Sequence, residues 1–114
     1  MQVDVRDDGG IVFIEPVGDI DGKTAPEFQD RVLGLVQPLA RIVLSLKRVA
    51  FMSSAGLRSV LLIYREAKSK EAKVVLTEVN KDIRGSMFAT GFLSFFVLCD
   101  SVQDSVRDSV WETG

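Results

Sequence analysis

The sequence contains no histidine and only one cysteine among its 114 residues. Without histidine there is no Ser-His-Asp or Cys-His relay, no imidazole ligand for a metal, and no side chain that titrates near neutral pH when unperturbed. The single Cys99 excludes an intrachain disulfide framework and disfavours a transition-metal site. A site built from carboxylates alone stays open, but no pattern points to one. We therefore expect a protein that is not an enzyme and that holds no metal or cofactor.

Basic charge and long apolar runs are also scarce. The net charge is −2 at pH 7, so the chain as a whole does not attract nucleic acid as a basic domain would. Apolar runs such as residues 60–64 are far shorter than the roughly 20 residues that span a bilayer. The first residues lack the basic and apolar regions of a signal peptide. We expect a cytoplasmic protein with no membrane span and no direct contact with nucleic acid.

The remaining composition is that of one globular domain. Hydrophobic residues make up 46% of the chain and charged residues 26%, which is ordinary for a soluble domain of this length. Short apolar runs predict five strands, with a tight turn through Gly9 and Gly10 between the first two. The predicted strands cover residues 3–5, 11–17, 41–46, 73–77 and 95–98. We expect residues 1–114 to form a single domain.

Helical spacing of apolar residues predicts about four helices between these strands. Thr24 and Glu27 suggest a capping box for the first helix. Its buried stripe of apolar residues runs from Ala25 to Leu39, and Pro38 is expected to end the helix. The second covers residues 54–69. A short third includes Val79, Ile83 and Met87 and stops at Gly91, and a fourth follows a cap at Ser101 or Asp100 with Val102, Val106 and Val110. We therefore expect an α/β fold with a mixed, mostly parallel sheet.

Three loops of this fold follow the carboxyl ends of predicted strands. They cover residues 18–23, 47–53 and 78–81. In an open α/β sheet this edge is the usual place for ligands and partners.

The second loop leads into Ser53 and Ser54 at the predicted start of a helix, where unpaired N–H groups and the helix dipole favour negative charge. Ser54 is expected to cap this helix and to be exposed, and Gly56 to allow a close approach of the backbone.

These segments resemble the STAS-domain anti-sigma factor antagonists. The likeness rests on Gly18-Asp19-Ile20-Asp21, on Ile42 to Leu46, on Phe51-Met52-Ser53-Ser54-Ala55-Gly56-Leu57, and on Lys73 to Leu76 with Gly91-Phe92-Leu93. In that family the usual motif is Asp-Ser-(Ser/Thr/Ala)-Gly-Leu, and the serine after the aspartate is phosphorylated. The resemblance therefore implies phosphorylation at Ser54, with Ser53 as the alternative acceptor. It also implies partner binding through a surface of seven residues: Asp19, Asp21, Ser53, Ser54, Ala55, Gly56 and Leu57.

The resemblance further implies partner switching. The unphosphorylated form would bind an anti-sigma factor that is also a serine-protein kinase, and so release a sigma factor. Phosphorylation would end this binding, and a serine phosphatase would restore it. We expect a monomer. Two alternatives stay open: a STAS scaffold or accessory subunit of a signalling or lipid-transport complex, and a module that binds a small ligand or nucleotide.

The chain departs from the family pattern at the phosphorylation motif. Ser53 replaces the family aspartate, and Lys47 and Arg48 make the preceding loop basic, where they offer partners for a phosphate. Other residues near this edge have structural interpretations. Asp19 and Asp21 suit a turn. Phe51 and Met52 are expected in the core or as half-buried anchors of the loop. A further set is expected in the core, where an exposed member would anchor a partner: Met87, Phe88, Phe92 and Phe95. Cys99 is expected to be a buried, small apolar residue.

Overall fold

The computed structural model of the chain describes residues 1–106 and Trp111. Within these residues, five strands form one sheet in the order β1-β2-β3-β4-β5, with β1 antiparallel to β2 and each later pair parallel. The strands are β1 (Gln2–Asp8), β2 (Ile11–Val17), β3 (Arg41–Ser45), β4 (Lys73–Thr77) and β5 (Val97–Cys99). The helices are α1 (Ala25–Leu33), α2 (Ser54–Ser69), α3 (Lys81–Ala89), the 3-10 helix η1 (Phe92–Phe95) and α4 (Val102–Ser105). The predicted α/β fold with a mixed, mostly parallel sheet is confirmed.

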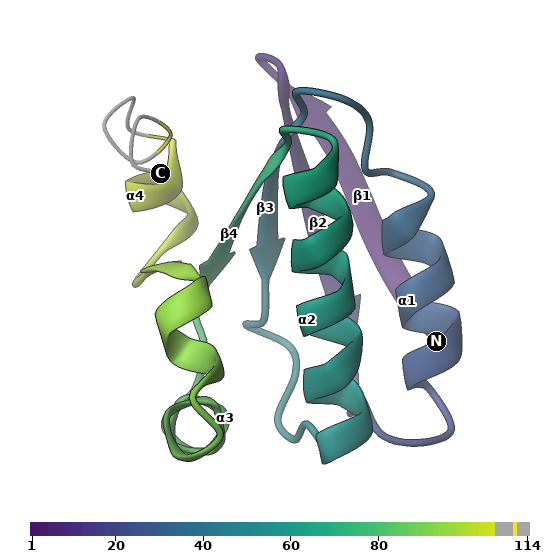
Figure 1. Ribbon diagram of the computed structural model, residues 1–114, viewed down its shortest axis with the longest axis vertical. Helices are drawn as coiled ribbons and strands as arrows, with labels where there is room; N and C mark the ends of the chain where they lie inside the picture. The colour runs from purple at the N-terminus through teal and green to yellow at the C-terminus, as the bar shows by residue number, and fades with distance from the viewer. Residues whose placement is uncertain (107–110, 112–114) are drawn as a thin grey trace.

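Helices α1 and α2 lie side by side on one face of the sheet (Figure 1). Successive side chains of a strand point to opposite faces, so β3 sends Ile42 and Leu44 into the main core and Val43 into a second cluster. The main core includes Phe28 of α1. The second cluster contains Trp111. Because both faces of β3 are covered, its sequence is a continuous apolar run rather than an alternating one.

The hairpin between β1 and β2 turns at Gly9 and Gly10, as the sequence predicts. Both residues have positive φ, +62° and +82°. Two consecutive positive φ angles match the twist of the flanking strands, and glycine adopts them without a steric cost. The turn fixes the register that pairs Asp4 with Glu15 and Arg6 with Phe13.

The first helix is shorter than its apolar stripe suggests. It ends at Leu33, and Gly34, a poor helix former, is its C-cap. Val36 is still buried, but Leu39 has a φ of +65° and is 71% exposed. Here the backbone turns towards β3, with the Leu39 N–H donating to the carbonyl oxygen of Lys70 (3.0 Å). The prediction that Leu39 belongs to the buried stripe is wrong, because the helix has already ended.

The last described strand begins later than predicted. Residues up to Phe95 form η1, and β5 starts at Val97. The Phe95 and Phe96 rings pack on Tyr64 of α2, with centroids 5.7 and 5.3 Å away, so this segment folds against the helix before it joins the sheet. Ser101 caps α4 by accepting from the N–H of Asp104 (3.2 Å).

Val110, predicted for the fourth helix, lies outside the described residues. Among residues 1–106 and Trp111, no helix has the length and apolar character that crossing a membrane requires.

Candidate functional site

The loops after β2 and β3 are joined along their length. Ile20 and Met52 form a parallel bridge. Three backbone hydrogen bonds connect the loops: Gly18 N–H to Arg48 O (3.0 Å), Ile20 N–H to Phe51 O (3.0 Å) and Ser53 N–H to Ile20 O (2.9 Å). This pairing places the segment of Asp19 and Asp21 directly beside the start of α2. The predicted convergence of these two loops is confirmed.

Asn80 ties the third loop to the same edge. Its side chain donates to the carbonyl oxygens of Val49 (3.3 Å) and Ala50 (3.0 Å) and accepts from the N–H of Ile83 (2.9 Å). It therefore caps α3 and holds the loop before α2. Asn80 falls within the predicted loop of residues 78–81, although asparagine before a charged first turn is a known start signal of a helix.

The two adjacent serines have different structural roles. Ser53 is the N-cap of α2, with extended backbone (φ −77°, ψ 175°), and its Oγ accepts from the N–H of Gly56 (3.3 Å). Ser54 is the first residue of the helix, is exposed, and its hydroxyl forms no hydrogen bond within the described part of the chain. The expectation that Ser54 caps the helix is wrong, because the bond from Ser53 N–H to Ile20 O fixes the helix start one residue earlier.

The start of α2 favours an anion at Ser54. The first turn of α2 contains no acidic residue, so the positive end of its dipole is not offset from within that turn. Arg48, one of the cations expected to support a phosphate, lies elsewhere: its guanidinium pairs with Asp4 (3.3 Å) and Glu15 (3.6 Å). Arg58, one helical turn after Ser54, is an exposed cation on α2 itself.

Asp21 organises the loop before α1. Its Oδ1 accepts from the backbone N–H groups of Lys23 (2.9 Å) and Thr24 (3.1 Å). These bonds, that from Thr24 first, lower the pKa of the Asp21 carboxyl below its usual value. The Thr24 hydroxyl donates to Asp19 O (2.8 Å) and accepts from Asp21 N–H (2.9 Å). Thr24 is therefore occupied in this turn, and makes no side-chain capping bond to α1; the predicted capping box is wrong.

The lowered pKa of Asp21 predicts a contribution to stability that acid removes. A carboxylate with a lower pKa in the folded than in the unfolded chain stabilises the fold above the unfolded pKa, about 3.9. That stability is lost as the pH falls through the folded value. Asp21→Asn should therefore show a weaker fall in stability below about pH 5, measured by urea denaturation at several pH values. Asp19→Asn, at an exposed carboxylate with no hydrogen bond in the described residues, is the matched control, and parallel curves for Asp21→Asn and the unmodified chain would contradict the assignment.

Gly56 and Leu57 support the site from beneath. A Cβ built on Gly56 would lie 2.5 Å from the carbonyl oxygen of Ile20 and 2.6 Å from Cγ of Met52. The predicted close approach of the backbone is therefore confirmed. Leu57 is buried in the main core, and Ala55 is partly exposed. The solvent-accessible part of this corner is thus formed by Asp19, Ser54 and the partly exposed Ser53, Asp21 and Ala55.

Several apolar side chains expected in the core are at the surface. Phe51 is 53% exposed, next to the buried Met52, because the Phe51 backbone is bonded to the neighbouring loop and its ring points away from the core. Together with Asp82 and Ser86 of α3, Phe51 lines a surface pocket of about 270 Å³. Met87 is core as predicted. The other side chains expected to be buried divide into exposed Phe88 and Phe95 and partly buried Phe92 and Cys99.

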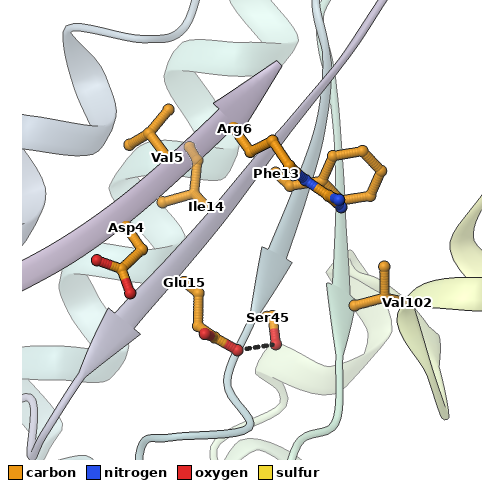
Figure 2. A pocket seen from close by; sticks show the side chains of 8 residues that line it. All are labelled: Asp4, Val5, Arg6, Phe13, Ile14, Glu15, Ser45 and Val102. Atoms are coloured by element: carbon orange, nitrogen blue, oxygen red, sulfur yellow. Dashed lines mark hydrogen bonds between the residues drawn. The ribbon is translucent and has the colours of Figure 1, made fainter. Parts of the chain in front are cut away.

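A separate pocket of about 220 Å³ lies where β1, β2 and the end of β3 face Val102 of α4 (Figure 2). Two of its polar side chains, Ser45 and Glu15, contact each other. Ser45 Oγ lies 3.4 Å from Glu15 Oε1, as the dashed line shows, and the Arg6 guanidinium stacks 4.5 Å from the centre of the Phe13 ring. Within the described residues, no group of three acidic or cysteine side chains is placed to hold a metal ion. This pocket does not include the three converging loops.

The sequence profile of the STAS domain family matches residues 2–106. Two curated relatives are similar in sequence. One is BtrV of Bordetella bronchiseptica, assigned by name to the anti-sigma factor antagonists, with 39% identity over 61 residues. That match covers 54% of this chain and 53% of BtrV, so it spans about half of the relative. The other is an anti-sigma F factor antagonist of Paenibacillus polymyxa, with 23% identity over 110 residues that cover 95% of this chain and 94% of the relative.

Solved structures share the fold. SpoIIAA of Bacillus, an anti-sigma factor antagonist, superimposes with a TM-score of 0.70 at 19% identity, covering 98% of this chain and 100% of that one in its unphosphorylated form. Its phosphorylated form gives a TM-score of 0.69. A sulfate transporter family protein of Wolinella succinogenes gives 0.78 at 16% identity, covering 93% and 91% of the two chains. At these identities the structural likeness shows the fold alone.

Proposed function

This chain belongs to the STAS domain family, and from that premise we propose that it is an anti-sigma factor antagonist controlled by phosphorylation of Ser54. In the unphosphorylated form it binds an anti-sigma factor that is also a serine kinase, and so frees a sigma factor. A serine phosphatase reverses the modification. The observation that carries the proposal is that the two serines have different roles. Ser53 caps α2, while the exposed hydroxyl of Ser54 forms no hydrogen bond within the described residues.

The charge of the phosphate supplies the switch. A phosphoserine carries about −1.5 to −2 charges and three strong acceptor oxygens at neutral pH. The start of α2 accommodates these because its N–H groups and dipole favour an anion. The fold therefore stays unchanged. A partner packed over the converged loops meets the new charge at the interface, where like-charge contact costs several kcal/mol.

The replacement of the family aspartate by Ser53 is compatible with this switch. Aspartate and serine are both strong N-cap residues, and Ser53 makes the capping bond that the position requires. Asp19 adds an exposed carboxylate on the loop that is hydrogen-bonded to the segment before Ser54. We propose that a partner contacts Asp19, Ser54 and Ala55, while Asp21, Ser53, Gly56 and Leu57 hold this surface in shape.

Phosphate mapping tests the proposed acceptor. The purified chain is incubated with ATP and, in turn, with each anti-sigma factor kinase encoded in the same genome, and the product is followed by intact mass and peptide sequencing. We expect one phosphate on the unmodified chain and on Ser53→Ala, and none on Ser54→Ala. Ser53→Ala also loses the cap, which costs roughly 0.5–2 kcal/mol, so its folding is checked by urea denaturation.

Full phosphorylation of Ser54→Ala would show that another residue is the acceptor. A partner that binds equally with and without phosphate on Ser54 would instead indicate an accessory subunit of a larger complex, whose association does not depend on the switch.

A further inference from the structure

A groove runs between α1 and α2 and begins beside Ser54. It has a volume of about 360 Å³. Small residues line it near the loop, namely Gly22, Ala25 and Ala55, and Leu62, 41% exposed, lies farther along α2. Ser59 and Gln29 in this groove bond to each other, with Ser59 Oγ 3.1 Å from Gln29 Oε1. The groove is thus partly apolar, and its end next to Ala55 adjoins the surface proposed above.

Two opposite charges face this groove from different helices. Arg58 belongs to α2 and Asp30 to α1, and both line the groove and are exposed. Within residues 1–106 and Trp111, neither side chain takes part in an ion pair or a hydrogen bond. Other charges on these helices do: Glu66 of α2 pairs with Lys70 (3.3 Å), and Arg31 of α1 donates to Val3 O (3.3 Å). The groove therefore presents one uncompensated cation and one uncompensated anion to whatever packs on it.

We propose that this groove is part of the docking site of the anti-sigma factor. The segment that docks places an apolar side chain over the small residues, with an acidic residue towards Arg58 and a basic residue towards Asp30. The proposal rests on the function proposed above and adds to it the chemistry of the partner. Opposite charges on the two walls also fix the direction in which such a segment lies, because the reversed orientation brings like charges together.

Arg58 couples this groove to the phosphorylation site. Residues four apart on a helix lie on the same face, so a phosphate on Ser54 comes within reach of the Arg58 guanidinium, which binds phosphate oxygens bidentately. In the unmodified chain Arg58 contacts the acidic residue of the partner. In the phosphorylated chain it contacts the phosphate, and the partner loses its counter-charge.

Charge reversal tests the docking site. Using the purified anti-sigma factor identified by phosphate mapping, calorimetry should show an affinity about 10–100-fold lower for Arg58→Glu than for the unmodified chain. Arg65→Glu, an identical charge change at an exposed position of α2 outside the groove, should change it less than about threefold. Reversal of the acidic partner residue should restore binding to Arg58→Glu. Equal affinities for Arg58→Glu and the unmodified chain would overturn the proposal.

The outcomes separate this proposal from the function on which it rests. If Ser54→Asp weakens binding and Arg58→Glu does not, the function stands and the groove is not the docking site. If neither variant changes the affinity, the function itself fails.

The coupling between Arg58 and the phosphate is tested separately, by the second pKa of the phosphoserine, which is followed by ³¹P resonance. We expect it to rise in Arg58→Ala, because a neighbouring cation stabilises the dianion; an unchanged value would overturn the coupling.

Discussion

Replacing Ser54 by aspartate is expected to lower the affinity for the anti-sigma factor by about 10–100-fold, or roughly 1.4–2.8 kcal/mol. The new carboxylate lies at the start of α2, where the helix dipole accepts it without a change in the fold. In the proposed complex, however, the partner packs over this position and meets the charge directly. Calorimetric titration measures the affinity, and thermal melting shows that the variant is folded. Since phosphate carries more charge than aspartate, this variant sets a lower bound on the effect of the proposed switch.

Ser53→Asp is the matched control for that variant. It adds the same charge one residue earlier, at the N-cap, where Ser53 accepts a hydrogen bond from Gly56 N–H. Aspartate makes this bond equally well, and it restores the residue that the family usually has there. We expect an affinity within a few-fold of the unmodified chain. Equal losses in the two variants would show that charge anywhere near the loop disturbs binding, and that Ser54 has no special place in the interface.

Replacing Gly56 by alanine is expected to destabilise the fold by about 1–3 kcal/mol. The added methyl group meets the backbone carbonyl of Ile20 at 2.5 Å, and this carbonyl cannot move aside because it accepts from Ser53 N–H (2.9 Å). The two loops would have to separate, so binding of the partner should weaken as well. Urea denaturation measures the loss, as a lower midpoint at an unchanged slope.

Gly85 in α3 offers the control for this substitution. A Cβ at Gly85 meets nothing within 4 Å, and alanine favours the helix over glycine by roughly 0.5–1 kcal/mol. Gly85→Ala should therefore raise the midpoint while Gly56→Ala lowers it. A midpoint for Gly56→Ala equal to that of the unmodified chain would contradict the close packing of the loops.

The elements that were predicted correctly are those fixed by local chemistry. Helix α2 was predicted with its observed bounds, because an apolar period of 3.6 begins directly after two serines. The turn at Gly9 and Gly10 follows from glycine alone. The identity of the N-cap of α2 does not follow from local sequence, because either serine suits that position. Ser53 is the cap because its N–H donates to the carbonyl oxygen of Ile20, in a loop over thirty residues earlier.

Side-chain positions in the candidate site were harder to predict for the same reason. Phe51 is apolar, yet its loop is held by backbone bonds that leave the ring in solvent. Arg48 is basic and close to Ser54 in sequence, but its guanidinium pairs with Asp4 and Glu15 on the neighbouring strands. Thr24 sits at the N-cap of α1, and the Asp21 turn occupies its hydroxyl. Each outcome depends on segments that meet only in the folded chain.

The most direct test of the switch compares two forms of one chain. The protein is prepared with phosphoserine placed at position 54 during synthesis and without it, and each form is titrated with the purified anti-sigma factor. We expect the phosphorylated form to bind at least about 100-fold more weakly. Its backbone amide spectrum should differ only around the converged loops and the start of α2. Equal dissociation constants, or spectral changes spread through the whole domain, would contradict a switch that blocks an interface without refolding.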